Sequence, residues 1–264
     1  MTVESLTAHE GPAAAESGEA TPAAALVVEI PEVAAWDEPA GLTARGTVVV
    51  LGGRGETPAV YARFGSRIAA DAYRVRALGD AAVDTDAIRA AALALLADPE
   101  LPAPKVLVGS DAGAALALEL AAGEARVDAL VIAGLPTSDA APEDIAGRTA
   151  CPGHQGVLAR ETTVDGRDRT LPAELLGITA SAVAVPVLAV HGSDDPVSPV
   201  AAAIETIRQA PRAEAHEVAG GLHDILNDVS HRSVAATVVL FLERVRLSGT
   251  AAAIVRRVET GTES

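Results

Sequence analysis

Two aspartates and a histidine stand in small-residue loops, in an order along the chain that suits hydrolytic chemistry. Asp111 is the middle residue of Gly109-Ser110-Asp111-Ala112-Gly113, Asp195 lies in the loop HGSDDPV, and His223 follows a pair of glycines. A carboxylate can attack an electrophilic carbon without losing a proton first, and a histidine oriented by a second carboxylate can activate water. We therefore interpret Asp111 as a candidate nucleophile, followed along the chain by a loop with two aspartates, Asp194 and Asp195, and by a histidine, in the order nucleophile, acid, histidine.

The pentapeptide around Asp111 joins two segments of different character. The run KVLVG (105–109) predicts a buried strand, and the alanine-rich run Ala112–Ala122 predicts a helix. A tight strand-to-helix turn needs small residues beside its apex, and the positive end of the helix dipole favours a carboxylate there. The plainer interpretation is that Asp111 only caps the helix.

Short β-branched runs alternate with segments of helical spacing over most of the chain. This alternation predicts an α/β fold with a mostly parallel sheet and helices on both faces. The expected strands are Leu26–Ile30, Val33–Trp36, Thr47–Leu51, Tyr73–Ala77, Lys105–Gly109, Asp128–Ala133, Val185–His191 and Ala213–Val218. The expected helices are Thr57–Ala70, Asp84–Ala97, Ala112–Ala122, Pro199–Gln209 and Ile225–Arg246.

The chain divides into a tail, a core and an insertion. Residues 1–25 are rich in small and acidic residues and are expected to form a weakly ordered tail. Residues 26–136 and 185–258 are expected to form the core. Residues 137–184 contain no convincing core strand, and a loop of that length predicts a cap or lid between two core strands.

Composition limits the function classes. The net charge of −16 disfavours nucleic acid and anionic membranes as partners, and no apolar run is long enough to span a bilayer. The single cysteine, Cys151, excludes an intramolecular disulfide and a multi-cysteine metal site, and the histidines show no metal-ligand spacing. We expect a cytoplasmic protein without metal or cofactor. Because only 2% of residues are aromatic, we expect any pocket to be lined mostly by aliphatic side chains.

Four segments carry a resemblance to a known family. They are LGGRGETPAVY (51–61), VLVGSDAGAALAL around the apex, HGSDDPVSP around Asp195 and GGLHDILND (220–228). Together they resemble the α/β-hydrolase superfamily, in particular its monoacylglycerol lipase and lysophospholipase-like branch (the serine-aminopeptidase-type hydrolases). The resemblance spans roughly residues 26–246 and implies an α/β-hydrolase fold with a short cap.

The resemblance also implies roles for single residues. It implies that Asp195 is the triad acid, with Asp194 as the alternative, and that His223 is the base. It further implies that the backbone N–H groups of Arg54 and Ala112 form an oxyanion hole. Two positions depart from the family pattern, because Gly52 replaces its usual histidine and Asp111 replaces its serine.

The aspartate at the apex resembles that of the haloalkane dehalogenases and epoxide hydrolases of the superfamily. Those relatives place Trp after the nucleophile or tyrosines in the cap, whereas here Ala112 follows Asp111 and residues 137–184 contain no Trp, Tyr or Phe. The cap offers other donors, namely His154, Arg160, Arg167 and Arg169. The expected function is therefore hydrolysis of a small apolar or ester-type substrate through an aspartyl-ester intermediate on Asp111. The alternatives are a carboxylic-ester or lipid hydrolase with a non-standard apex, and a non-catalytic protein that binds a small molecule.

Several candidates have structural interpretations beside the functional ones. His223 could be a capping or core histidine, and Asp195 or Ser198 could cap the following helix. Arg54 could be plain surface charge or could pair with Glu56. It could also point its guanidinium at the pocket and bind a carboxylate or phosphate of the substrate.

Overall fold

A sheet of long apolar strands forms the centre of the protein. The computed structural model describes residues 31–123, 126–141, 144–162 and 170–256. Within these residues, seven strands are arranged in the order β1-β3-β2-β4-β5-β6-β7. Their bounds are β1 Ala34–Trp36, β2 Gly46–Gly52, β3 Tyr73–Asp80, β4 Lys105–Ser110, β5 Ala129–Ala133, β6 Val187–Gly192 and β7 Ala213–Val218. Only β1 pairs antiparallel, with β3, and the other neighbours pair parallel.

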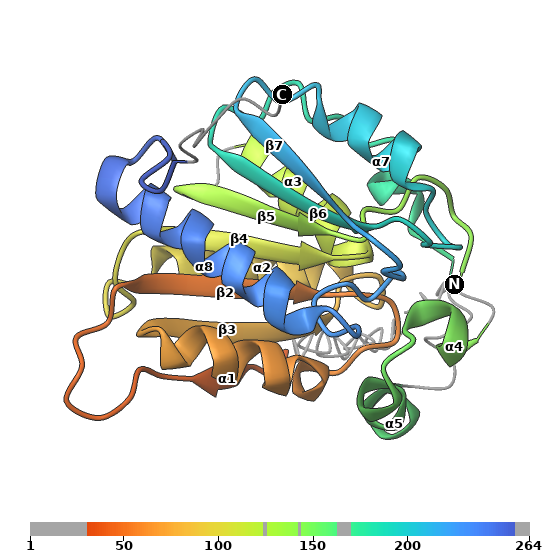
Figure 1. Ribbon diagram of the computed structural model, residues 1–264, viewed down its shortest axis with the longest axis horizontal. Helices are drawn as coiled ribbons and strands as arrows, with labels where there is room; N and C mark the ends of the chain where they lie inside the picture. The colour runs from red at the N-terminus through yellow and green to blue at the C-terminus, as the bar shows by residue number, and fades with distance from the viewer. Residues whose placement is uncertain (1–30, 124–125, 142–143, 163–169, 257–264) are drawn as a thin grey trace, which may run out of the picture.

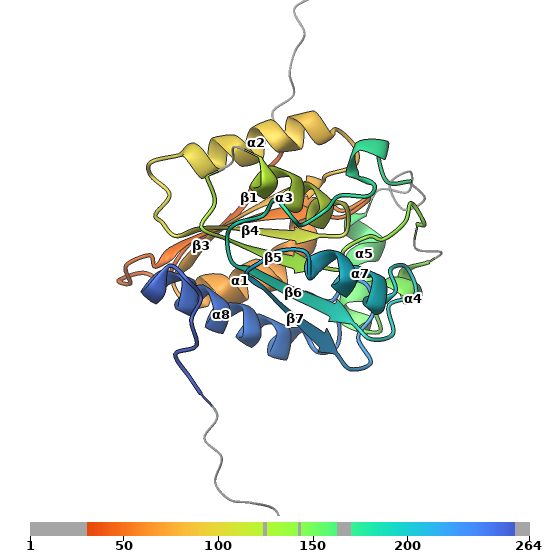
Figure 2. The same ribbon diagram turned by 90° about the horizontal axis from the view of Figure 1, so that it is seen from above.

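The central strands are buried on both faces because helices cover both sides of the sheet (Figures 1 and 2). On one side, α2 (Thr85–Ala97), α3 (Ala112–Ala122) and α7 (Val200–Ile207) pack on a core that includes Leu107 and Leu130. On the other side, α1 (Ala62–Ala70) and α8 (His231–Ser248) pack on a core that includes Val108 and Val131. The alternation of side chains along each strand sends neighbouring residues into the two opposite cores.

The segment between β5 and β6 forms short helices at one end of the sheet. It contains α4 (Ile145–Arg148), α5 (Pro152–Glu161) and the 3-10 turn η2 (Ala173–Leu175). Figure 1 places α4 and α5 beyond the arrowheads of the central strands, which is the end where the candidate residues lie. Thr162 makes an isolated β-bridge with Glu56 of the loop after β2, so this segment contacts the core beside that loop.

The expected α/β architecture is confirmed, with differences at some ends of elements. Helix α3 and strand β7 have the expected bounds, whereas Thr57–Ala70 divides into the 3-10 turn η1 (Pro58–Tyr61) and α1. The expected helix start at Ile225 is wrong, because α8 begins at His231. The strand expected at Leu26–Ile30 and the tail over residues 1–25 lie outside the described residues. Within the described part of the chain, no helix is long and apolar enough to cross a membrane.

Candidate active site

Asp111 occupies the apex of a sharp turn between β4 and α3. Its backbone has φ +49° and ψ −120°, a conformation that side chains other than glycine rarely adopt. The turn is tight, since a Cβ at Gly109 would overlap the carbonyl oxygen of Gly113, and one at Gly113 would overlap that of Leu51. The Asp111 side chain makes no capping hydrogen bond to the helix that it precedes. The interpretation of Asp111 as a simple helix cap is therefore wrong.

The imidazole of His223 lies between two carboxylates. Its Nδ1 is 2.8 Å from Oδ2 of Asp195, and its Nε2 is 3.3 Å from Oδ1 of Asp111. The contact with Asp111 is an ion pair rather than an aligned hydrogen bond, because Nε2 has no hydrogen-bond partner among the described residues. All three side chains are buried, and His223 is only 1% exposed. The structure thus brings together the three residues that the sequence nominated.

Asp195 is held in place by its own loop and by His191. Its Oδ1 accepts hydrogen bonds from the backbone N–H groups of Val197 at 2.8 Å and Ser198 at 3.0 Å. Its Oδ2 lies 3.1 Å from Nε2 of His191. Asp194 is exposed and accepts instead from the hydroxyl of Ser193. The loop hydrogen bonds leave Oδ2 of Asp195 directed at His223, so Asp195 rather than Asp194 is the acid in contact with the histidine.

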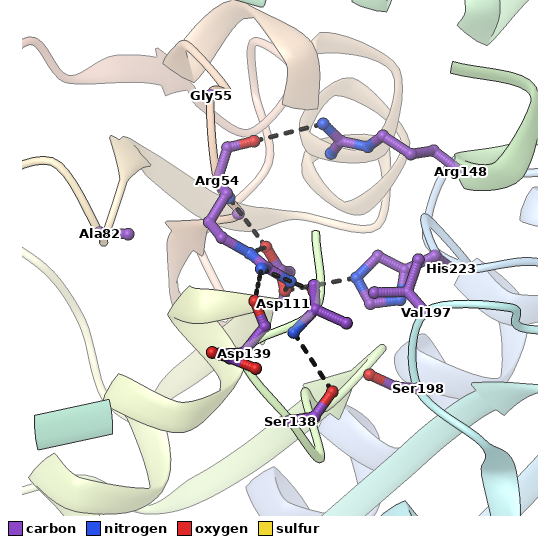
Figure 3. Close-up of polar contacts among 12 residues, drawn as sticks. Arg54, Gly55, Ala82, Asp111, Ser138, Asp139, Arg148, Val197, Ser198 and His223 are labelled. Atoms are coloured by element: carbon purple, nitrogen blue, oxygen red, sulfur yellow. Dashed lines mark hydrogen bonds and ion pairs between the residues drawn. The ribbon is translucent and has the colours of Figure 1, made fainter. Parts of the chain in front are cut away.

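Arg54 makes the most extensive contact with the apex carboxylate. Its backbone N–H donates to Oδ2 of Asp111 at 2.9 Å, its Nε donates to the same oxygen at 2.8 Å, and its Nη2 donates to Oδ1 at 2.8 Å (Figure 3). Its Nη1 donates to the backbone carbonyls of Ala140 at 2.8 Å and Asp139 at 3.4 Å. Arg54 is 1% exposed, so the interpretation as surface charge is wrong. Glu56 has other partners, so the expected pair with Glu56 is also wrong.

Arg148, which ends α4, joins the segment between β5 and β6 to the loop after β2. Its Nη1 donates to the carbonyl of Arg54 at 3.2 Å (Figure 3). Its Nη2 donates to Glu56. Its Nε and Nη2 both donate to Oδ1 of Asp224 at 3.1 Å. His154 of α5 contacts the other oxygen of Asp224 at 3.1 Å. A second buried ionic cluster therefore lies directly beside the first and holds α4 and α5 against the core.

The buried charges perturb one another strongly. Burial alone would lower the pKa of His223, but its contacts with Asp111 and Asp195 outweigh burial and raise the pKa to about 10. Burial alone would raise the pKa of Asp111, but the charge of Arg54 and the proximity of His223 hold it well below its usual range. At neutral pH the site therefore contains an imidazolium between two ionised carboxylates, with Arg54 as a second cation.

Sequence reasoning missed Arg148, His154 and Glu56 as parts of the same buried network. Glu56 lies within the segment LGGRGETPAVY, which carries part of the family resemblance, whereas Arg148 lies outside all four such segments. His154 is bound to Asp224 and is therefore no free donor for a leaving group. Of the other expected cap donors, Arg160 is exposed in the last turn of α5, and Arg167 and Arg169 lie outside the described residues. Ala112 is fully buried at the first position of α3, and the carboxylate contacts come from Arg54 and His223. Over the described ranges, no group of His, Cys, Asp and Glu is arranged to hold a metal ion.

Comparison with known proteins identifies the fold. No protein-family model and no curated protein sequence matches the chain. Among solved structures, it is similar to a monoacylglycerol lipase from Paleococcus ferrophilus, with a TM-score of 0.64 and 14% identity over 80% of this chain and 98% of that one. It is similar to a soluble variant of monoglyceride lipase from Saccharomyces cerevisiae, with a TM-score of 0.63 and 14% identity over 81% and 96% of the two chains. An esterase from Exiguobacterium antarcticum gives a TM-score of 0.59 and 16% identity over 80% and 94%. The protein therefore has the α/β-hydrolase fold.

Proposed function

We propose that the protein is a cofactor-independent hydrolase in which Asp111 forms an ester with the substrate and His223 activates the water that cleaves it. The observation that carries this proposal is the position of the His223 ring, 3.3 Å from Asp111 and 2.8 Å from Asp195. Asp111 lies at the apex of the strand-to-helix turn, where this fold presents its nucleophile. The names of the structural neighbours and the scarcity of aromatic residues suggest a small apolar or ester-type substrate.

In the first step, an oxygen of Asp111 attacks a carbon of the substrate. The new bond joins Oδ1 to that carbon, and the bond from carbon to the leaving group breaks, with the electron pair going to the leaving group. Because the pKa of Asp111 lies well below its usual range, the carboxylate is ionised at neutral pH and needs no base.

In the second step, His223 takes a proton from water, and the resulting hydroxide adds to Cγ of Asp111. Negative charge develops on Oδ2, which already accepts the Arg54 backbone N–H at 2.9 Å. The second oxyanion donor in this proposal is the N–H of Ala112. The bond from Cγ to Oδ1 then breaks while His223 returns its proton to Oδ1, so the product leaves as an alcohol that contains Oδ1. Asp111 keeps the oxygen from water and loses the remaining proton to solvent, which restores its carboxylate.

The two steps are linked by the charge of Asp111. With its pKa raised to about 10, His223 is protonated at neutral pH and cannot accept a proton from water. Formation of the ester neutralises Asp111 and removes one of the two carboxylates that raise this pKa. The pKa of His223 then falls, the imidazolium releases its proton to solvent, and the base becomes available when there is an ester to hydrolyse.

One observation favours a second candidate function, the binding of a small molecule without turnover. The guanidinium of Arg54 occupies both oxygens of Asp111, and a carboxylate engaged in this way is a poor nucleophile until it is released. An ester or lipid hydrolase with Asp111 as a non-standard apex is less well supported. Attack by a carboxylate on an ester carbonyl would give a mixed anhydride, which is itself highly reactive.

Trapping of the ester intermediate tests the proposal. In the His223→Gln variant, incubation with alkyl halides and epoxides should leave an alkyl ester on Asp111. The tryptic peptide that follows Lys105 and ends at Arg126 contains Asp111 as its only aspartate, so mass spectrometry can assign the adduct. His231→Gln, at a histidine outside the site, is the matched control and should accumulate no adduct. Absence of any adduct, with tight retention of an apolar ligand, would favour the binding candidate.

A further inference from the structure

The guanidinium of Arg54 and the carboxylate of Asp111 form a closed, two-point ion pair. Nε and Nη2 each lie 2.8 Å from a carboxylate oxygen, and the side chains are 1% and 3% exposed. Figure 3 shows the guanidinium lying directly against the apex carboxylate, with His223 on the other side of Asp111. The hydrogen bonds from Arg54 thus engage the oxygen lone pairs that Asp111 would use for attack on carbon.

When Asp111 is released, Arg54 loses the carboxylate that accepts hydrogen bonds from its Nε and Nη2. A buried guanidinium that loses its counter-charge is strongly destabilised, since solvation by water does not replace the lost interaction. A neutral substrate that displaced Asp111 would incur this cost in full. A substrate that carries its own negative charge would not, because it supplies a new counter-charge as Asp111 becomes free.

The geometry of Arg54 favours a particular kind of anion. The two N–H groups that face Asp111 form the planar fork that binds carboxylates at two points. The orientation of this fork is fixed from behind, because Nη1 donates to the carbonyls of Asp139 and Ala140 in the cap. A substrate carboxylate can therefore replace the Asp111 carboxylate like for like, on the same edge of the same guanidinium.

We propose that the substrate is a carboxylic acid whose reacting carbon lies next to its carboxylate, and that Arg54 selects it by exchanging Asp111 for that carboxylate. This inference rests on the proposed function, because it requires Asp111 to be the nucleophile. After the exchange, Asp111 keeps the backbone N–H of Arg54 on Oδ2. Oδ1 is then free to attack the neighbouring carbon while the leaving group departs with its electron pair.

Two small alkylating agents of nearly equal size test the inference. Bromoacetate carries the carboxylate, and bromoacetamide replaces it with a neutral amide. We expect wild-type protein to release bromide from bromoacetate at least roughly tenfold faster, after division by each probe's rate with a free thiol. In the His223→Gln variant, the carboxymethyl ester should accumulate on Asp111, which peptide mapping separates from any label on Cys151.

Variants of Arg54 provide the controls. Arg54→Met should lose the preference for bromoacetate, because the guanidinium that would bind its carboxylate at two points is removed. Arg54→Lys should keep only part of it, because an ammonium is a point charge without the fork. Arg208→Met removes an arginine that is 72% exposed and should keep the full preference. The comparison of the two probes on wild-type protein stands even if an Arg54 variant does not fold.

Three outcomes separate this inference from the proposed function. Faster reaction of bromoacetate at Asp111 supports both. Reaction of Asp111 with both probes at equal normalised rates, or faster with bromoacetamide, overturns the selection of carboxylic acids and leaves Asp111 as the nucleophile. No reaction of either probe at Asp111 overturns the proposed function, and the inference fails with it.

Discussion

The pair of Arg54 and Asp111 predicts a strong energetic coupling that a double-mutant cycle can measure. Arg54→Met removes the cation while keeping an unbranched side chain of similar length. Asp111→Asn keeps the shape of the carboxylate but removes its charge. Removal of one partner from a buried ion pair leaves an uncompensated charge and typically costs about 3–5 kcal/mol in the free energy of unfolding. We expect each single variant to fall near the lower end, because His223 and the cap carbonyls still contact the remaining partner.

The double variant should be less destabilised than the sum of the two single variants, because neither charge is then left buried alone. Residues in direct contact give coupling energies of about 0.5–3 kcal/mol, and this two-point buried pair should reach at least about 2 kcal/mol. Urea unfolding can be followed by the fluorescence of Trp36, the only tryptophan, which packs against α1 at Gly65. Far-UV circular dichroism provides the second probe that a two-state treatment needs. Additivity within about 0.5 kcal/mol would refute the reasoning.

Three further predictions follow from the buried charges and from the turn at the apex. The raised pKa of His223 stabilises the folded protein fully below pH about 6.5, and this contribution is lost as the pH rises towards about 10. The urea midpoint of the wild-type protein should therefore fall over this pH range by more than the midpoint of Asp111→Asn. Arg148→Met leaves two cap-facing carboxylates without their arginine and should cost about 3–5 kcal/mol, with faster proteolysis of the cap, whereas the exposed Arg208→Met should cost under about 0.5 kcal/mol. Gly109→Ala should destabilise the protein by more than about 1 kcal/mol, since its Cβ would overlap backbone atoms of the turn; an unchanged thermal midpoint would contradict the described geometry.

The sequence supports most of the fold because local patterns and tertiary packing agree over the core. Alanine-rich Ala112–Ala122 and the alternating run Ala213–Val218 became α3 and β7 with their expected bounds. The error at the start of α8 has a physical cause in the loop after His223. There, Asp228 accepts hydrogen bonds from the backbone N–H groups of Leu222 at 2.9 Å and Ala150 at 2.9 Å. The contact from Leu222 closes the loop on itself and the contact from Ala150 binds it to the segment between β5 and β6, so the loop is kept out of the helix by contacts that no sequence period reveals.

Only part of the candidate site could be predicted from the sequence. The chain order of Asp111, Asp195 and His223 was enough to predict that they would meet, because the carboxyl ends of parallel strands share one edge of the sheet. The guanidinium of Arg54 and the cluster around Arg148 were not predictable in this detail. Their contacts cross from the loop after β2 to the cap, and the packing of the cap depends on tertiary contacts rather than on local periodicity.

The fate of oxygen in water tests the central claim most directly. If wild-type protein turns over bromoacetate, or a substrate found later, in heavy-oxygen water, hydrolysis of an aspartyl ester places the water oxygen in the carboxylate of Asp111. Mass spectrometry of the peptide between Lys105 and Arg126 should then show heavy oxygen on Asp111 after turnover and none without substrate. Product formation with heavy oxygen found only in the product during the first turnover, and none on Asp111, would contradict nucleophilic attack by this residue.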